Sequence, residues 1–499
     1  MSAISPFSDG AALARAADIL DPPPDPYFER FDLWVLDFIR FDPGEEPTEY
    51  QLWELRELPV VKRISVRGPH GLGKTTTAAW AVLAFALTRE KAHKDWKAPT
   101  TASVWRQLTK FLWPEIHKWA RRILWDKLGW RGPFNERTEL LKLNLNLVWG
   151  QAFALASDTP EAIEGVHADQ VLYIYDEAKA IDAEVYDATE GAFAGAGEST
   201  GKVAFAMANS TPGPTSGRFH DIHMRKAGYR DWTCRHVTLE EAIASRRISQ
   251  EWADARKLQW GDRSGVYQNR VLGHFASDDE NAVIPLSWVE EAVLRWEDQS
   301  VSPPDFTCLG VDVARSGLDK TVLAHRHDLV ITELNKYTRM DTMETTGCVA
   351  GVLRNKGGYA MVDVIGIGAG VVDRLRELGF ETYAFNAGLH TDVTDVSGEL
   401  EFLNTRSAAW WNTRELLNPA HKLPTAIPDD DDLIGDLTTP HWRTTSAGKI
   451  QVESKDDIRK RIGRSTDAGD AVVQSFWPTD VGGVEVVMSD FDDVHISPY

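Results

Sequence analysis

The chain has 499 residues, too many for a single hydrophobic core, so its length predicts two to four domains. Its composition, 43% hydrophobic and 26% charged, is typical of globular proteins, and no apolar run is long enough to span a membrane. The net charge of -21 excludes an overall attraction to nucleic acid, so any DNA site must depend on local clusters of basic residues.

Residues 1–44 are predicted to form an N-terminal extension that carries one packing helix. Residues 21–26, Asp-Pro-Pro-Pro-Asp-Pro, are typical of a stiff spacer, and residues 27–40 place aromatic and aliphatic side chains at helical spacing. The first residues lack the basic and apolar regions of a signal peptide, which predicts a cytoplasmic protein. Three widely separated cysteines without a C-x-x-C pair indicate neither disulfides nor a zinc site.

A phosphate-binding loop is predicted at Gly68–Thr75, where the sequence GPHGLGKT matches G-x-x-x-x-G-K-[ST] at every fixed position. Residues 60–66 predict a buried strand that leads into the loop, and residues 76–87 predict a buried helix that leaves it. The helix would direct its N-terminal amides at bound phosphates. Lys74 is expected to reach the β- and γ-phosphates, and the Thr75 hydroxyl to ligate Mg²⁺. The chain is therefore predicted to bind a nucleoside triphosphate.

Gln51 lies 17 residues before the loop, where its amide could hold an edge of adenine. A glutamine on a surface helix explains the same spacing equally well. Residues 101–108 are predicted to end a strand and begin a long amphipathic helix with basic residues and tryptophans. Its basic residues would either line a path for DNA or form a solvated face, and its tryptophans are expected in the core.

A second motif ends the apolar run Val171–Ala178, which has the length of a buried strand. Asp176 is expected to hold Mg²⁺, and Glu177 to orient and deprotonate the attacking water. Such a glutamate is typical of translocating or remodelling ATPases rather than of P-loop kinases. A third predicted strand, residues 203–208, runs into Asn209–Pro212, whose small polar side chains are placed to sense the γ-phosphate.

After a predicted linker at residues 261–302, a second domain is expected to carry three separated carboxylates. They lie in a predicted strand followed by an antiparallel strand, in a second apolar strand, and at the start of the last helix: Asp312, Asp363 and Asp470, with Asp467 beside the last. A carboxylate in an apolar strand costs several kcal/mol unless a positive charge offsets it. Each alone could belong to a turn or a cap, but together they favour a two-metal phosphodiesterase centre.

Basic residues precede the last carboxylates: Lys455, Arg459, Lys460, Arg461 and Arg464. This basic run is expected to hold the backbone of a phosphodiester substrate. Residues 479–499 are acidic, lack Lys and Arg, and are predicted to be disordered.

In order and spacing these motifs resemble the large terminase subunit of tailed bacteriophages, the motor and nuclease that packages DNA into a procapsid. The resemblance covers about residues 45 to 477 and implies an α/β chain of two main domains. A RecA-like (ASCE) P-loop ATPase domain would span residues 45–260, and an RNase H-like nuclease domain residues 303–478. The matching stretches are Gly68–Thr75, Val171–Ala178, Asn209–Pro212, Gly310–Thr321, Met361–Asp363 and Asp467–Ala471.

The resemblance also implies roles for individual residues. Glu177 would be the catalytic glutamate and Asn209–Thr211 the segment that couples hydrolysis to movement. Asp312, Asp363 and Asp470 would hold two Mg²⁺ or Mn²⁺ ions, with Asp467 as a less certain fourth ligand. ATP and Mg²⁺ would bind Gln51, Gly68, Gly71, Gly73, Lys74, Thr75, Thr76, Asp176 and Asn209.

One departure from the family concerns the arginine that many large terminases insert into a neighbouring subunit's ATP site. That arginine lies shortly before the second carboxylate strand, but here no Lys or Arg occurs from Leu143 to Ala178. Arg67, directly before the phosphate loop, is therefore a candidate acting in cis, and Arg218 a weaker candidate acting in trans.

The leading hypothesis is an ATP-driven translocase of double-stranded DNA combined with a DNA endonuclease. As implied partners we expect the portal protein, the small terminase subunit and a homo-oligomeric ring, expected to be a pentamer, on the procapsid. The ring would work in the cytoplasm of the bacterial host, and we expect no membrane partner. A helicase-nuclease of recombination or repair is an alternative, but it would need strand-separation motifs that the sequence lacks. A P-loop assembly protein with a non-cleaving DNA-binding domain is another, against which the three carboxylates argue.

Overall fold

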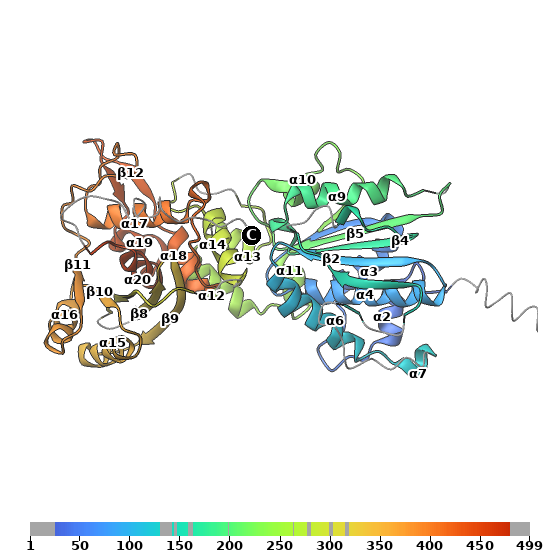
Figure 1. The fold of residues 1–499 in the computed structure, drawn as a ribbon, viewed down its shortest axis with the longest axis horizontal. Coiled ribbons are helices and arrows are strands. Elements are labelled where there is room, and N and C mark those ends of the chain that lie inside the picture. The colour runs from blue at the N-terminus through green and yellow to red at the C-terminus, as the bar shows by residue number, and fades with distance from the viewer. Residues whose placement is uncertain are drawn as a thin grey trace, which may run out of the picture. The chain divides into compact units, whose positions relative to one another are not determined.

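The computed structural model describes residues 25–129, 142–143, 147–157, 163–197, 199–262, 264–276, 281–298, 303–314 and 319–479. Its contacts divide the chain into a first unit, Met1–Trp252 with Asn269–Ala276, and a second unit, Ala253–Gln268 with Ser277–Tyr499 (Figure 1). The predicted disordered tail from residue 480 onward and the proline-rich spacer up to residue 24 lie outside the described residues. No helix in the described part of the chain is long and apolar enough to cross a membrane.

The first unit contains a six-stranded sheet in the order β3-β2-β4-β5-β1-β6, and all its neighbouring strands are parallel. β5 lies between β1, which leads into the phosphate loop, and β4, which ends in the carboxylate pair. This insertion is the arrangement of RecA-like ASCE ATPases, so the predicted fold class is confirmed. The strands are β1 (Arg63–Arg67), β2 (Trp96–Ala102), β3 (Gly150–Ala154), β4 (Gln170–Asp176), β5 (Val203–Ser210) and β6 (Thr233–His236).

Helices cover both faces of this sheet (Figure 1). α2 (Phe31–Phe38), α4 (Lys74–Lys91) and α6 (Trp113–Ala120) pack in one apolar cluster, and α9 (Ala183–Ala194) and α10 (Gly217–His223) pack in another. Every residue of β4 is buried, as expected for a parallel strand covered on both sides. The sheet therefore places its functional residues at the carboxyl ends of its strands, where loops begin.

Two predicted elements of the first unit differ from the structure. The strand predicted at residues 60–66 begins only at Arg63, because residues 60 and 61 end α3 (Glu49–Val61), which starts with a Thr48–Gln51 capping box. The predicted long amphipathic helix is divided into α5 (Trp105–Gln107), a π-helical turn (Leu108–Leu112), α6 and α7 (Trp125–Leu128). Of the tryptophans expected in the core, Trp113 and Trp119 are buried there, whereas Trp125 is only partly buried against it. The first unit also contains α11 (Leu239–Ala244).

The second unit contains a five-stranded sheet in the order β11-β10-β7-β8-β9. β7, β8 and β9 form an antiparallel meander, and β10 and β11 extend it in parallel with β7. This order is that of RNase H-like domains, so the second predicted fold is also confirmed. The strands are β7 (Cys308–Asp312), β8 (Lys320–His327), β9 (Val330–Thr338), β10 (Tyr359–Asp363) and β11 (Thr382–Phe385).

α15 (Thr342–Lys356) and α16 (Gly368–Glu377) pack against this sheet in one apolar cluster, and α20 (Asp467–Ser475) contacts β7, β8 and β10. A Cβ on Gly310 of β7 would lie 2.1 Å from the Ala471 carbonyl of α20, so only glycine permits this approach. The unit also contains α12 (Gln250–Trp260, which begins in the first unit), α13 (Gly265–Arg270, which ends in the first unit), α14 (Leu286–Asp298), α17 (Thr405–Leu417), α18 (Asp431–Thr438), β12 (Trp442–Thr444), β13 (Ile450–Val452) and α19 (Lys455–Ile462).

Candidate active sites

The predicted phosphate loop joins β1 to α4. Gly71 and Gly73 have φ angles of 85° and 74°, a backbone region that favours glycine, and Gly73 is the N-cap residue of α4. Gly68 has no room for a side chain, because a Cβ would lie 2.6 Å from Leu72 Cδ1 and 2.8 Å from the Val237 carbonyl. α4 begins directly at the loop, so the positive end of its dipole lies there, as an anion site requires.

Lys74 and Thr75 occupy the first turn of α4. The Lys74 Nζ donates a hydrogen bond to the Pro69 carbonyl at 2.9 Å, and the Thr75 hydroxyl donates one to Asp176 Oδ1 at 3.3 Å. The hydroxyl and the carboxylate predicted to hold Mg²⁺ are therefore neighbours. Burial, with a contribution from Glu177, raises the pKa of Asp176 to about 7, and burial lowers the pKa of Lys74. A group of opposite charge bound in this site would therefore stabilise the charged forms of Asp176 and Lys74.

Glu177 comes directly after β4 and has a left-handed backbone, with φ 48° and ψ 50°. Its Oε2 accepts a hydrogen bond from the Ser210 hydroxyl at 2.9 Å. The register of β4 and β5, which pairs Asp176 with Asn209, puts these two side chains next to each other. The predicted catalytic glutamate and the predicted coupling segment are therefore in direct contact.

Thr76 lies in the first turn of α4, and the side chain of Gln51 reaches the same turn from α3. The Gln51 Nε2 donates to the Gly73 carbonyl at 3.2 Å and to the Thr77 hydroxyl at 3.1 Å, and the residue is only 1% exposed. The Thr76 hydroxyl donates to Glu115 Oε1 at 2.8 Å. Gln51 thus braces the phosphate loop, and its contact with adenine stays a prediction, as does the nucleotide contact of Thr76.

Glu54 is a residue of this site that the sequence analysis missed. It lies one helical turn after Gln51 on α3 and is 2% exposed. Burial raises the pKa of Glu54 to about 8, although Asn209, Arg235 and Lys74 oppose this shift. The spacing of three residues from Gln51, on the helix face turned to the loop, is the sequence signal that could have identified it.

Both arginine candidates have partners inside the first unit. The Arg67 Nη1 donates to the Gly273 carbonyl, and its guanidinium carbon lies 5.0 Å from the centre of the Phe275 ring. Arg218 forms an ion pair with Asp187 at 2.7 Å. Their roles in ATP hydrolysis therefore stay predictions, with Arg67 the one that directly precedes the loop.

The three predicted nuclease carboxylates meet in the second unit. Asp312 ends β7 and Asp363 ends β10, which are adjacent parallel strands, and Asp470 projects from α20. The Lys455 Nζ lies 2.8 Å from Asp312 Oδ1. The same nitrogen lies 3.3 Å from Asp470 Oδ2 and 3.6 Å from Asp363 Oδ2. The sequence placed Lys455 in the predicted DNA-binding run, whereas the structure places its ammonium among the carboxylates.

Asp470 is held by three further side chains. It accepts hydrogen bonds from Arg406 Nη1 at 2.6 Å, the Thr466 hydroxyl at 2.8 Å and Trp410 Nε1 at 3.2 Å. Burial alone would raise the pKa of Asp470, but Arg406 and Lys455 outweigh it, so the pKa is lowered. Arg406 lies 64 residues before Asp470 in the sequence, and no motif connected the two.

The charges of this centre fit a cation. Burial raises the pKa of Asp312 to about 8, against the effect of Lys455, and burial also raises the pKa of Asp363. Burial alone would lower the pKa of Lys455, but the three carboxylates outweigh burial, so the pKa is raised. The Lys455 side chain as a whole is 30% exposed. Carboxylate oxygens are the ligands that Mg²⁺ and Mn²⁺ prefer, so this donor set suits such an ion. In the described parts of the chain, however, no group of three or more such side chains is arranged to hold a metal ion.

Asp467, the less certain fourth ligand, interacts electrostatically with Lys455 but has its hydrogen bonds elsewhere. Its Oδ2 accepts from the Lys320 backbone amide at 2.8 Å, and its Oδ1 accepts from the Ser465 hydroxyl. These bonds direct its carboxylate toward β8, so its role as a ligand stays a prediction.

The predicted basic run is engaged with carboxylates of its own unit. Besides Lys455, its members form the ion pairs Arg459–Asp319, Lys460–Asp457, Arg461–Glu453 and Arg464–Asp436. Their positive charge is therefore largely offset, and of the five only Lys460 has a strongly exposed side chain, at 78%. Binding of the DNA backbone by this run stays a prediction.

No family model matches the chain. Over 269 residues it is 26% identical to a protein of Enterobacteria phage P7 described as a probable terminase, large subunit. The match covers 52% of this chain and 51% of that protein, so the chain spans about half the length of the curated relative it matches. The resemblance to phage large terminases is confirmed by this similarity.

Two solved structures are also similar. The nuclease domain of the large terminase subunit gp2 of bacterial virus Sf6 is 19% identical, with a TM-score of 0.36, and covers 40% of this chain and all of that one. The large terminase of a thermophilic bacteriophage in complex with ADP is 13% identical, with a TM-score of 0.40, and covers 86% of this chain and 99% of that one. At these scores the fold assignment depends on the strand order of the two sheets.

Proposed function

We propose that this protein is a viral DNA-packaging motor subunit, which hydrolyses ATP to move double-stranded DNA into a procapsid and cuts concatemeric DNA. The observation that carries the proposal is that Asp312, Asp363 and Asp470 all lie within ion-pair distance of the Lys455 ammonium, so the three carboxylates form one cluster. This centre occurs in the same chain as a phosphate loop whose Thr75 touches Asp176. A subunit that both moves and cuts DNA needs both centres.

ATP hydrolysis is assigned to the first unit. Lys74 and the loop amides would hold the phosphates, and Thr75 with Asp176 would hold Mg²⁺. Glu177 would orient the attacking water and accept its proton. Its hydrogen bond from Ser210 supports a role for residues 209–211 in relaying the state of this site.

Two further roles in the first unit belong to the same proposal. Gln51 would approach the adenine from α3, because its amide already lies against Gly73. Arg67 would stabilise developing charge in cis, because β1 carries it directly into the phosphate loop. The glycines of the loop, Asn209 and Thr76 would complete the nucleotide site.

DNA cleavage is assigned to the second unit. Asp312, Asp363 and Asp470 would hold two Mg²⁺ or Mn²⁺ ions, with Asp467 nearby. Bound divalent ions would supply activation of water and neutralisation of charge at the scissile phosphate. The chain's own contribution is positional, since Arg406, Thr466 and Trp410 fix the Asp470 carboxylate. The Lys455 ammonium interacts with all three carboxylates and would compete with a divalent ion for the same oxygens.

Partners follow from the proposed activity. We propose that the chain works as a homo-oligomeric ring, expected to be a pentamer, docked on the portal protein of a procapsid. The small terminase subunit would supply it with DNA. The ring would operate in the cytoplasm of the bacterial host.

The test measures two activities of the full chain side by side. DNA-stimulated ATP hydrolysis and Mg²⁺- or Mn²⁺-dependent nicking of plasmid DNA are expected together in the wild type. Asp312→Asn, Asp363→Asn and Asp470→Asn should each lose nicking by about 100-fold or more, as about 10²–10⁴-fold effects are typical of groups at the reacting centre. Each should keep its ATPase activity, and a cooperative melting curve controls for folding of the second unit, to which the substituted residues belong.

Two results would count against the proposal. A wild type that hydrolyses ATP but neither nicks DNA nor gains thermal stability with millimolar Mn²⁺ would make the second unit a non-cleaving DNA-binding domain. Unwinding of a DNA duplex by the chain would instead favour a helicase-nuclease.

A further inference from the structure

The last helix in the described part of the second unit, α20, carries Asp470 but is not capped by the residue at its N-cap position. That residue is Thr466, and its side chain accepts no hydrogen bond from the first turn of the helix. Its hydroxyl instead donates to Asp470 Oδ2 at 2.8 Å. A threonine at this position usually caps the helix with its own oxygen. Here the hydroxyl serves the carboxylate.

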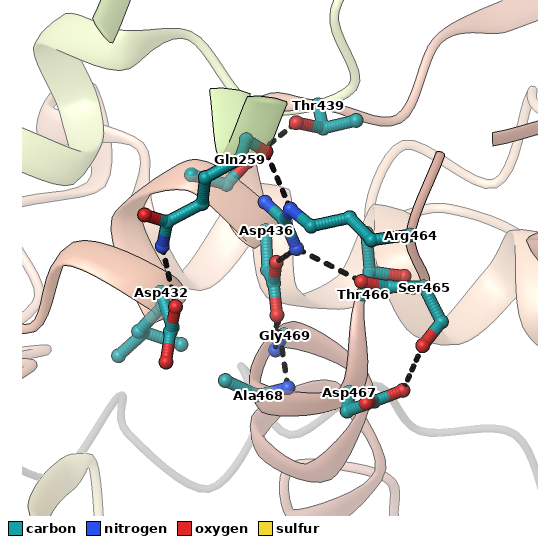
Figure 2. Close-up of polar contacts among 12 residues, drawn as sticks. Gln259, Asp432, Asp436, Thr439, Arg464, Ser465, Thr466, Asp467, Ala468 and Gly469 are labelled. Atoms are coloured by element: carbon teal, nitrogen blue, oxygen red, sulfur yellow. Dashed lines mark hydrogen bonds and ion pairs between the residues drawn. The ribbon is translucent and has the colours of Figure 1, made fainter. Parts of the chain in front are cut away.

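The cap is supplied by another helix. Asp436, from α18, accepts hydrogen bonds through its Oδ2 from the backbone amides of Ala468 at 2.9 Å and Gly469 at 3.2 Å (Figure 2). These amides belong to the first turn of α20, whose donors have no partner within the helix. Asp436 is 2% exposed, so its bonds form away from water.

Asp436 is itself held in place by a second residue. Its Oδ1 accepts from Arg464 Nη1, and the Arg464 Nε donates to the Gln259 carbonyl of α12 (Figure 2). The backbone of α20 also comes very close, because a Cβ on Gly469 would lie 2.9 Å from the Asp436 Cβ and 3.2 Å from Trp410 Cη2. Glycine at 469 therefore allows the contact, and the same Trp410 donates to Asp470. The cap and the carboxylate are parts of one packed cluster.

We propose that Asp436 is a positioning residue of the nuclease centre, which caps α20 from α18 and so leaves the Thr466 hydroxyl free to orient Asp470. The inference rests on the proposed nuclease function and deepens it. In the absence of Asp436, we expect the Thr466 side chain to turn toward the unpaired amides of the first turn, as a threonine at the N-cap usually does, and so to lose its present orientation toward Asp470.

An ordinary stabilising cap is the alternative, and the same unit contains a second aspartate cap, on an exposed helix end, that serves as a control. Asp341 caps α15 in the same unit, with its Oδ1 accepting from the Glu344 amide at 2.8 Å. It bonds with Glu344 and Thr345, away from the carboxylates. Asp341→Ala therefore removes a helix cap of the same chemistry without touching the nuclease centre.

The experiment compares full-length variants in plasmid nicking over a series of Mn²⁺ concentrations. Asp436→Ala and Thr466→Val are expected to lower the nicking rate or raise the Mn²⁺ requirement by about 10–100-fold, as removal of a residue behind a metal ligand typically does. Asp436→Asn, which keeps an oxygen for the two amides, and Thr466→Ser, which keeps the hydroxyl, should recover most of the activity. Asp341→Ala should nick like the wild type. ATP hydrolysis should be unchanged in all five variants.

A second readout does not depend on cleavage. Mn²⁺ should raise the melting temperature of Asp436→Asn and Thr466→Ser as it does for the wild type, and raise it less for Asp436→Ala and Thr466→Val. Equal nicking and equal Mn²⁺ response in Asp436→Ala and Asp341→Ala would overturn the inference while leaving the proposed nuclease intact. If Asp436→Ala does not fold, then failure of Thr466→Val to change the Mn²⁺ response overturns it. A wild type that neither nicks nor responds to Mn²⁺ would overturn the proposed function and this inference with it.

Discussion

Glu177 Oε2 accepts a hydrogen bond from the Ser210 hydroxyl at 2.9 Å, across the neighbouring ends of β4 and β5. The bond holds the proposed water-activating carboxylate in one rotamer on a left-handed backbone. It also connects that carboxylate directly to β5, whose last residue is Ser210. A change at Ser210 should therefore be felt in the chemistry of ATP hydrolysis.

Glu177→Gln should bind ATP but hydrolyse it at least about 100-fold more slowly, because an amide can hold the water but cannot accept its proton. Ser210→Ala should reduce hydrolysis by a smaller factor, since it loosens the base without removing it. If Ser210 acts through Glu177, the double variant should be no slower than Glu177→Gln alone. Steady-state hydrolysis rates and nucleotide binding measure both effects, and additive losses in the double variant would show that the two act independently.

Lys74→Ala should abolish ATP turnover and leave DNA nicking intact. Lys74 contacts the phosphate loop, through Pro69, and the carboxylates that would cut DNA belong to another unit. Hydrolysis and plasmid nicking measured on the same preparation provide the test. Undiminished hydrolysis in this variant would remove the basis of the motor proposal.

Lys455→Ala should destabilise the second unit in the absence of divalent ions, on the order of a few kcal/mol, because it leaves the buried Asp312 and Asp363 carboxylates without a cation while Asp470 keeps Arg406. The same variant should gain more thermal stability from Mn²⁺ than the wild type, because the ammonium no longer competes for the oxygens. Melting curves with and without Mn²⁺ measure both effects. Lys460→Ala, on the same helix with a 78% exposed side chain, is the control and should change neither value. Equal Mn²⁺ gains in Lys455→Ala and the wild type would contradict the competition.

Glu54 predicts a pH dependence of stability in the first unit. Burial raises its pKa to about 8, so the folded chain keeps this carboxyl protonated where the unfolded chain, with an ordinary pKa of about 4.3, ionises it. Its contribution to the free energy of unfolding is thus complete below about pH 4 and is lost as the pH rises through 8. Glu54→Gln should therefore raise the melting temperature relative to the wild type at about pH 9 and much less at about pH 5.

The control for this prediction is Glu49→Gln, which changes an exposed residue on the same helix, α3. Its melting temperature should follow the wild type across the pH range. An equal pH dependence in Glu54→Gln and the wild type would mean that the Glu54 carboxyl is charged in the folded chain.

Much of the fold could be predicted from the sequence because its signals are local. The glycine spacing of the phosphate loop and the apolar runs that end in Asp176 and Asp363 each specify a strand and the turn after it. The prediction of a strand at residues 60–66 was wrong at its start. Pro59, Val60 and Val61 have the apolar character of a strand but form the end of α3. Val60 is 65% exposed, and the C-cap of α3 is Lys62, whose left-handed backbone and N–H bond to the Leu58 carbonyl close the helix before the strand begins.

The partners of the carboxylates could not be predicted in the same way. Lys455 belongs to a basic run whose composition indicates DNA binding, and only the fold brings its ammonium to Asp312 from 143 residues away. Arg406 and Asp436 likewise act on α20 from distant helices, with no periodicity to connect them. Glu54 differs, since its position one helical turn from Gln51 can be read from the sequence. Its burial could not be predicted, because glutamates are rarely buried.

The path of the chain bears on how the two units can be produced as separate fragments. The backbone passes from the first unit to the second after Trp252, returns for Asn269–Ala276, and passes over again. A fragment that started at residue 303 would lack Trp260, whose indole donates to the Asp431 carbonyl and packs on Gly435. One that ended at Trp252 would lack the carbonyl that receives Arg67. A single protease cut thus cannot leave both units whole, and independent expression requires a nuclease fragment that begins by Ala253 and an ATPase fragment supplied with residues 269–276.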